Sequence, residues 1–540
     1  MISLRSLPLA LGAAVLAGCS DSFLTETPID FVGPSNFYNT AADAVAATNA
    51  AYASFVTLPA PLSNDGYYGR NFFMIAEYPT EVVTNRLSAG NERSVFDNYN
   101  PIMNPAHPYL QTVWQSAYAG INRANAVIDR VPAIPMDTTL RRRLVGEAKF
   151  LRAIHYYNLA GLFGAVPVRL TETTTLEALE SPRTSADSVY AQVARDLDDA
   201  IAVLPERSGY GASDYGRATR GAARVMLAKA LLQAAATRNA PATANTRAAE
   251  LLRQVIASNE YALDANYASL FDGTNERSRE IIFALQHIRV EGAGGRLSQW
   301  FAPAPRAGSP VFPGALTHFS VEWPFLQSYH PNDVRRAGTW LLSFQQDGRT
   351  VSFPLTLPTA ATDRTNLNNA YGGQTGGPVP RKYIDFGAVD GAEGIDYVLL
   401  RHADVLLMLA EAVNTVAGPT TEAYAAINAV RARAQVPPLV AGLTAAAFRD
   451  SLFVQRRFEF AVEGHGVFDS RRHWDWAKRR VEEHMALTGS TGVGINRTTF
   501  TSLVPKLNSA PINDRWRLYP IPQRAIELNP RIGITQNPGW

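Results

Sequence analysis

Residues 396–476 decide the fold, because they contain three apolar patterns with helical spacing. They include the segments DYVLLRHADVLLMLAEAVN, AYAAINAVRARAQV and FRDSLFVQRRFEFAVEGHGVFDSRRHWDW. In the first segment the apolar side chains recur on one face, which is typical of an amphipathic helix. The second repeats the pattern with smaller side chains, so the two helices can lie antiparallel across the Gly418-Pro419 link. The third predicts a more charged helix, on which Arg456, Glu459 and Glu463 share one face.

The two acids of the third segment allow two interpretations. Glycosidases use two carboxylates a fixed distance apart, so Glu459 and Glu463 could form a catalytic pair. Cationic neighbours favour ion pairing instead, because they lower the pKa of an acid without implying chemistry. The arginines close in sequence are Arg456, Arg457, Arg471 and Arg472. We therefore predict that these arginines pair with the two acids and that the pair is structural.

The composition is that of a water-soluble globular protein. The chain has 540 residues, 46% of them hydrophobic, and this length exceeds what one simple core usually organises. Fifty basic against forty-eight acidic residues give no strong net field, so neither nucleic acid nor an anionic surface is implied as a partner. After the N-terminal segment, no apolar run reaches membrane-spanning length.

The N-terminus has the layout of a secretory signal. Arg5 precedes an apolar run that is too short for a permanent membrane span, and the run ends in Leu-Ala-Gly-Cys at Cys19. This tetrapeptide looks like a bacterial lipobox, in which the thiol receives acyl chains that anchor firmly. Cys19 is the only cysteine, so no disulfide can form within the chain. We expect a signal peptide at 1–18, a lipidated tether at 19–35 and a folded domain at 36–540. An incidental cysteine is the alternative.

The rest of the chain predicts an all-α fold with minor β structure. Helices are predicted at 37–55, 114–128, 141–162, 186–204, 217–236 and 245–258. Long helices alternate with short links as in tetratricopeptide-like pairs, although no strict repeat is present, so we predict an irregular α-solenoid. Ile281–Leu285 predicts a short buried strand. Two irregular segments, 58–108 and 261–395, interrupt the helices and are rich in aromatic, glycine and asparagine residues.

Several motifs resemble one known family. RHADVLLMLAEAVN, INAVRARA and RRFEFAVEGHGVFDSRRHW are similar to the C-terminal signatures of the SusD/RagB family of outer-membrane nutrient-binding lipoproteins. Asp404 and Arg456 depart from the pattern, because the family usually has glutamate at both positions. The resemblance implies a lipid-anchored protein on the exterior of the bacterial outer membrane. It also implies a TonB-dependent transporter of the SusC type as partner, with delivery of the bound nutrient to it.

The search for catalytic motifs is negative. The sequence has no serine-hydrolase elbow, phosphate-binding loop, zinc-protease motif, dinucleotide fingerprint or calcium loop. His465 and His473 lie near Glu463, but their spacing is too loose to predict a metal site. We therefore expect no catalytic residue, no metal and no cofactor.

Carbohydrate recognition is the function that we expect. It needs aromatic faces for sugar rings and polar groups for hydroxyls, and loops on a scaffold are where such residues gather. The candidates in the two irregular segments are Tyr67, Tyr68, Arg70, Asn85, Arg86, Tyr99, Trp300, Phe301 and Trp323. If the segments meet on one face, these residues should form an open aromatic platform. For each aromatic, core packing is the alternative. A peptide-binding RagB-like protein or a surface glycoside hydrolase are the alternatives for the whole chain.

Overall fold

The computed structural model describes most of the chain beyond the N-terminus. The described residues are 37–56, 67–85, 92–97, 99–100, 102–175, 180–237, 243–290, 293–303, 315–346, 349–353, 355, 378–388, 392–487, 512–529 and 536–540. The predicted signal peptide and the whole predicted tether, including Cys19, lie outside them.

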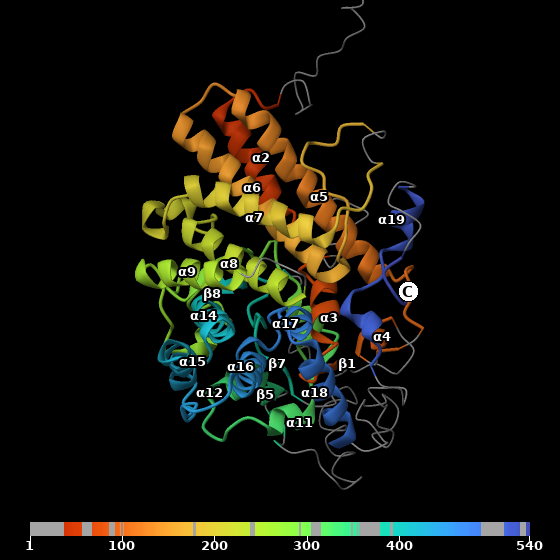
Figure 1. Cartoon of the computed structure of the whole chain (residues 1–540), viewed down its shortest axis with the longest axis vertical. Coiled ribbons are helices and arrows are strands. Elements are labelled where there is room, and N and C mark those ends of the chain that lie inside the picture. Colours follow the sequence, from red (N-terminus) through yellow and green to blue (C-terminus); the bar gives the residue numbers. More distant parts are fainter. Residues whose placement is uncertain are drawn as a thin grey trace, which may run out of the picture.

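Long helices build the N-terminal half, and each packs on the next along the chain (Figure 1). They are α2 (Ala41–Ala53), α5 (Pro108–Arg130), α6 (Thr138–Phe163), α7 (Ala186–Val203), α8 (Arg220–Thr237) and α9 (Ala244–Ala257). The four predicted helices between 141 and 258 agree with α6 to α9 to within about three residues at each end. The predicted helix 37–55 begins later, because Thr40 caps α2 and accepts a hydrogen bond from the Asp43 amide at 3.2 Å.

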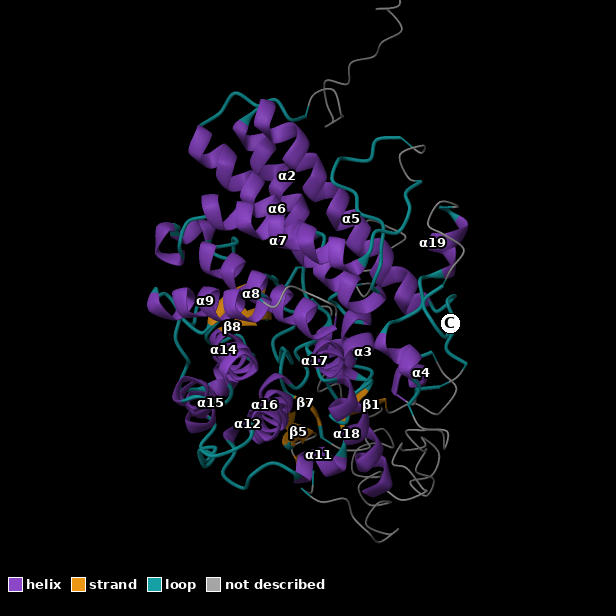
Figure 2. Ribbon diagram, viewed as in Figure 1, coloured by secondary structure: helices purple, strands orange, loops and turns teal. Residues whose placement is uncertain are grey.

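The C-terminal half continues the stack, with α9 packed on α14 and α14 packed on α15 and α16 (Figure 1). Its helices are α14 (His402–Ala417), α15 (Thr421–Arg433), α16 (Ala445–Phe460), α17 (Gly466–Arg472) and α18 (Trp474–Leu487). The mainly helical fold with tetratricopeptide-like pairs is thus confirmed, and strands are a minor part of it (Figure 2). None of the described helices is both long and apolar enough to cross a membrane.

The predicted third helix is wrong in one respect, because it breaks between Phe460 and Gly466. The backbone there takes positive φ at Val462 (64°) and Gly464 (81°). Side chains from the second irregular segment satisfy the carbonyls that the helix leaves open. Lys382 Nζ donates to the carbonyls of Glu459 and Ala461, at 3.2 and 3.0 Å. Glu463 therefore lies beyond the end of α16 and not on its face.

The strands form four two-stranded antiparallel sheets among the described residues. The pairs are β1 (Val83–Asn85) with β3 (Phe319–Val321), β2 (Ile281–Leu285) with β8 (Tyr397–Arg401), β4 (Trp340–Leu341) with β7 (Val379–Pro380), and β5 (Ser343–Gln346) with β6 (Arg349–Ser352). The predicted strand coincides with β2 and is fully buried. The β1–β3 pair joins the two irregular segments, with Val83 opposite Val321. These segments therefore meet in the fold.

Short helices complete the described chain. The α-helices are α3 (Asn71–Glu77), α4 (Ser94–Asp97), α10 (Leu297–Phe301), α11 (Trp323–Gln327), α12 (Val334–Thr339) and α19 (Gln523–Glu527). The 3₁₀ helices are η2 (Val131–Ala133), η4 (Arg207–Gly209), η5 (Ala212–Asp214), η6 (Tyr267–Leu270) and η7 (Asp514–Arg517). One hydrophobic cluster connects side chains from α3, the long helices and the irregular segments, so these parts share a core.

Candidate functional site

Glu459 lies at the centre of a buried ion-pair network. Its carboxylate accepts hydrogen bonds from Arg401 Nη1 at 2.6 Å, from Arg335 Nη1 at 3.0 Å and from Arg433 Nη2. Burial opposes the ionisation of this carboxyl, but the three guanidinium groups outweigh it and hold the pKa of Glu459 well below its usual range.

Glu463 extends the same network. It accepts hydrogen bonds from Arg401 Nε at 2.8 Å and from Lys382 Nζ at 2.7 Å. Burial again opposes ionisation, yet Arg401 and Lys382 lower the pKa of Glu463. A general acid for glycoside hydrolysis needs a raised pKa, and neither glutamate has one. The predicted ion pairing of the two acids is therefore confirmed.

The partners predicted for the two acids are wrong. The arginines close in sequence contact other groups, both those on α16 with Glu459 and those on α17. Arg456 donates to Asp469 Oδ2 at 2.8 Å and to Asp404 Oδ1 at 2.7 Å. Asp404, one of the departures from the family pattern, thus pairs with Arg456. Arg472 pairs with Glu411, and Arg457 contacts Glu81 and Ser470. Arg471 donates to main-chain carbonyls.

Most of the predicted binding aromatics lie in the core. Asn158 Nδ2 donates to the hydroxyls of both Tyr67 and Tyr68, at 2.8 and 2.7 Å, and these rings are buried. The hydroxyl of Tyr99 donates to the Pro79 carbonyl at 2.7 Å. The other buried candidates are Asn85, Trp300, Phe301 and Trp323, and Arg86 lies outside the described residues. The candidates therefore form no open aromatic platform within the described structure.

Arg70 is the partly exposed member among the described candidates. Its guanidinium lies 4.4 Å from the centroid of the Trp300 ring and 5.2 Å from that of Tyr109. Arg93 lies on the same side and contacts His318 Nε2 at 3.1 Å, and the His318 ring packs on Trp300. The two irregular segments thus place cationic groups over a buried aromatic layer, where cation–π contacts hold the guanidinium of Arg70.

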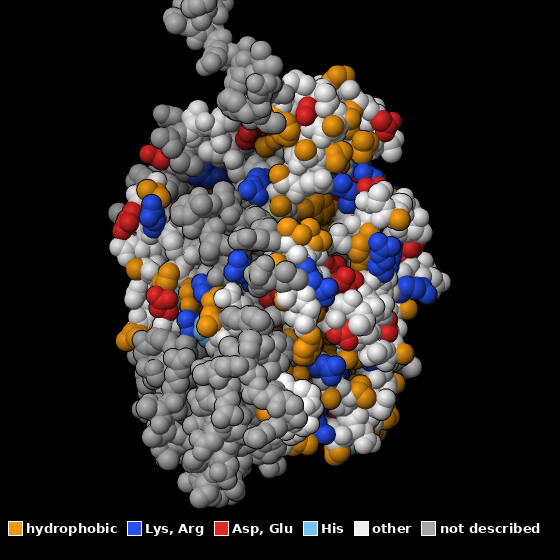
Figure 3. Space-filling model, turned by 180° about the vertical axis from the view of Figure 1, so that it is seen from behind, with side chains coloured by type: hydrophobic (Ala, Val, Ile, Leu, Met, Phe, Trp, Pro, Cys, Tyr) orange, Lys and Arg blue, Asp and Glu red, His pale blue; other side chains and the backbone are white. Residues whose placement is uncertain are grey.

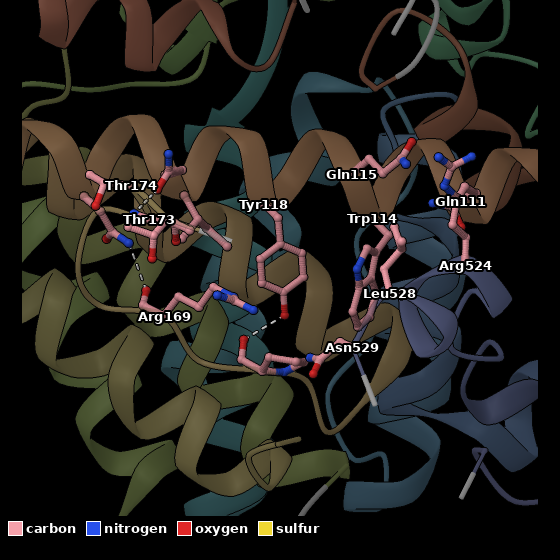
Figure 4. Close-up of a pocket in the computed structure, with 16 residues that line it drawn as sticks. Gln111, Trp114, Gln115, Tyr118, Arg169, Thr173, Thr174, Arg524, Leu528 and Asn529 are labelled. Carbon is pink, nitrogen blue, oxygen red and sulfur yellow. Dashed lines mark hydrogen bonds between the residues drawn. The ribbon is translucent and has the colours of Figure 1, made fainter. Parts of the chain in front are cut away.

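A pocket of about 530 Å³ lies between α5, residues 167–175 and the segment around α19. We call it the α5–α19 pocket. Figure 4 shows Trp114 and Tyr118 extending from α5 into it and Arg169 reaching toward Tyr118. Its volume is within the range of small-molecule sites. The described lining residues are Gln111, Trp114, Gln115, Tyr118, Ile121, Asn122, Asn125, Pro167, Arg169, Thr173, Thr174, Thr175, Arg524, Ala525, Leu528 and Asn529.

Hydrogen bonds fix the wall formed by residues 167–175. The Tyr118 hydroxyl donates to the Pro167 carbonyl at 2.7 Å, and the Thr173 amide donates to Asn122 Oδ1 at 2.7 Å. Asn125 Nδ2 donates to the carbonyl of Thr171 at 2.8 Å. Asn125 is itself held by Arg152, which donates to its Oδ1 at 2.7 Å. The pocket is thus largely preformed, which lowers the entropy lost when a ligand binds.

The lining combines apolar surface with unused polar groups. The side chains of Gln111 and Gln115 have no hydrogen-bond partner among the described residues, although both carry amide donors and acceptors. Leu528 is 65% exposed at the rim and Tyr118 is partly exposed, whereas Trp114 and Ile121 are buried. Apolar faces beside amides can contact a ligand that has both hydrophobic faces and hydroxyl groups.

The apolar pattern of α5 predicts its core side but not this pocket. In that pattern Trp114, Tyr118 and Asn125 are only positions with helical spacing. The signal that could have found the pocket is the set Gln111, Gln115, Tyr118, Asn122 and Asn125, whose spacing places all five along one face of a helix. The contribution of α19 has no such local signal, because it depends on how distant segments pack.

Comparison with known proteins places the chain in a family. A model of the SusD family matches residues 258–540, which is more than half of the chain. The chain belongs to the SusD family. A second model, described as starch-binding and associating with the outer membrane, matches residues 63–232.

Relatives match along almost the whole chain. SusD-like protein P25 of Formosa agariphila is 27% identical, over 94% of each chain. Among solved structures, a SusD homologue from Bacteroides thetaiotaomicron matches with a TM-score of 0.76 and 23% identity, covering 94% of this chain and 98% of that one. A laminarin-binding SusD-like protein matches with a TM-score of 0.69 and 22% identity, covering 93% and 100%. These two likenesses concern the fold.

Proposed function

We propose that this protein binds an oligosaccharide or polysaccharide at the cell surface and delivers it to a TonB-dependent transporter of the SusC type. Membership of the SusD family carries the proposal, because matches to its models cover both halves of the chain. The names of relatives give the same chemistry: one structural neighbour is a laminarin-binding protein and another is a surface glycan-binding protein.

The α5–α19 pocket supports a binding role. Its amide groups can exchange hydrogen bonds with sugar hydroxyls, and the partly exposed Tyr118 and the exposed Leu528 can contact the faces of sugar rings. Arg70 over Trp300 offers a second polar surface, where the two irregular segments meet. Individual contacts of this kind contribute about 0.5 to 1.5 kcal/mol, so we expect weak, reversible binding that allows transfer to a pore.

The alternatives have less support. A surface glycoside hydrolase would need an acid with a raised pKa beside a second carboxylate, and Glu459 and Glu463 are both held ionised by arginines. A peptide-binding role has no specific observation in its favour. We also propose that Cys19 carries the lipid anchor and that the protein faces the exterior of the outer membrane. The family description that includes association with the outer membrane supports this location.

Affinity electrophoresis of the purified protein in gels containing different polysaccharides tests the proposal. We expect at least one polysaccharide to retard the protein without being cleaved. Replacing both Gln111 and Gln115 by alanine should weaken that retardation, because these amides face the pocket. Gln254→Ala, on the exposed side of α9, is the matched control and should change nothing. Release of shortened glycan, or retardation by no polysaccharide class at all, would contradict the proposal.

A further inference from the structure

The charges that line the α5–α19 pocket are all of one sign among the described residues. Arg169 and Arg524 line it, and no described lining residue is acidic. The surface elsewhere is different: on the described part of the face in Figure 3, positive and negative side chains are interspersed. The chain as a whole is nearly balanced, with 50 basic and 48 acidic residues. The described lining of the pocket thus carries positive charge only.

The two arginines enter from different walls. Arg169 belongs to the segment after α6. Its main-chain carbonyl accepts hydrogen bonds from the Tyr156 hydroxyl at 2.8 Å and from Asn125 Nδ2 at 3.2 Å. Arg524 lies in α19 at the other end of the pocket, beside Gln111 (Figure 4). Its side chain forms no ion pair with any described residue. An exposed guanidinium of this kind is available to a ligand.

The α19 wall is fixed in place although it lies near the end of the chain. Asn529 Nδ2 donates to the Ser181 carbonyl at 2.8 Å, and the Ser181 amide donates to Asn529 Oδ1 at 3.1 Å. This reciprocal pair ties the segment after α19 to the segment before α7. Arg524 thus projects from a backbone whose position is set, so its charge is directed at the pocket.

We propose that the α5–α19 pocket selects an anionic glycan, one whose sugars carry carboxylate or sulfate groups. The inference rests on the proposed function and names the ligand class of that site. Guanidinium groups bind carboxylate and sulfate oxygens through two parallel N–H donors, so the contact depends on the orientation of the anionic group as well as on its charge. Gln111 and Gln115 then bind hydroxyls, and Tyr118 and Leu528 contact ring faces.

Calorimetry on the full chain in detergent, with matched pairs of ligands, tests the inference. One pair is an oligogalacturonide and its neutral methyl ester, and the other is a sulfated galactan oligosaccharide and its desulfated form. We expect at least one anionic form to bind about tenfold more tightly than its neutral counterpart, a difference that added salt should reduce. The pair that shows this preference distinguishes carboxylate from sulfate.

Variants locate the preference. Arg524→Gln should remove most of it without lowering the melting temperature, because this side chain has no described partner. Arg169→Gln should act in the same direction. Arg142→Gln, an exposed arginine of α6 that does not line the pocket, is the control and should keep the full preference.

Three results would overturn the inference. They are equal binding of charged and neutral forms, a preference that survives both pocket variants, and tight binding of an acidic peptide but of no acidic glycan. In the first two cases glycan binding itself, and so the proposed function, would stand. Binding of no glycan, charged or neutral, would instead refute the proposed function.

Discussion

Replacing Glu459 by glutamine should destabilise the protein strongly. The substitution keeps the shape of the side chain but removes the charge that three buried guanidinium groups share, those of Arg335, Arg401 and Arg433. Removing one partner of a buried ion pair costs about 3 to 5 kcal/mol, because the remaining charge stays buried without compensation. Arg401 retains Glu463 and Glu280 as partners, and Arg335 retains Asp333. We therefore expect a loss of about 3 kcal/mol, the lower end of that range.

Urea unfolding followed by circular dichroism at neutral pH measures this loss. Glu422→Gln is the matched control, because Glu422 pairs with Arg253 at the surface, where both side chains are 40% exposed or more. An exposed pair contributes about 0.2 to 1 kcal/mol, so the control should unfold close to the native protein. If Glu459→Gln unfolds at the same urea concentration as the control, the network is not stabilising and this reasoning is refuted. Loss of a glycan-cleaving rate at unchanged stability would support catalysis instead.

Two further predictions concern pH and anchoring. Burial raises the pKa of Glu393 to about 8, so the folded state keeps a proton that the unfolded state releases above its ordinary pKa. This group therefore contributes stability at acidic pH that is lost as the pH rises through about 8. The fall in melting temperature between pH 6 and 9 should be smaller for Glu393→Gln than for the native protein. An identical fall in both proteins would contradict this prediction. Cys19→Ala should leave the helical circular dichroism unchanged and move the protein from the membrane to the soluble fraction after cell fractionation, whereas retention in the membrane would disprove lipidation at this thiol.

The sequence predicted the scaffold better than the site. Long helices such as α6 and α7 follow from periodicity and local caps, as where Asp137 accepts a hydrogen bond from the Leu140 amide at 2.8 Å. The helix break after Phe460 could not be predicted in this way, because Lys382 and Tyr267 complete it from distant parts of the chain. A local pattern cannot show such partners.

The predicted aromatic platform is missing from the described residues for a related reason. Trp300 and Trp323 stand in glycine- and proline-rich sequence, which favours an exposed loop, yet both rings are buried. The β1–β3 pairing brings the two irregular segments together, so their aromatics cover one another. Composition shows that a segment is irregular, but it does not show whether its rings face solvent. The α5–α19 pocket shows the opposite case: its Tyr118 lies on a regular helix and still lines a pocket.

The α19 wall of the pocket links binding to the order in which the chain is made. Gln111 on α5 and Arg524 on α19 lie far apart in the sequence, so a polypeptide emerging from N- to C-terminus can complete the helical stack before this wall exists. The α19 wall is therefore added to the pocket after the α5 wall. A ligand that contacts both walls favours the state in which the final segment is docked, by the ordinary linkage between binding and folding. A ligand bound between α5 and α19 would therefore increase the free energy needed to undock α19.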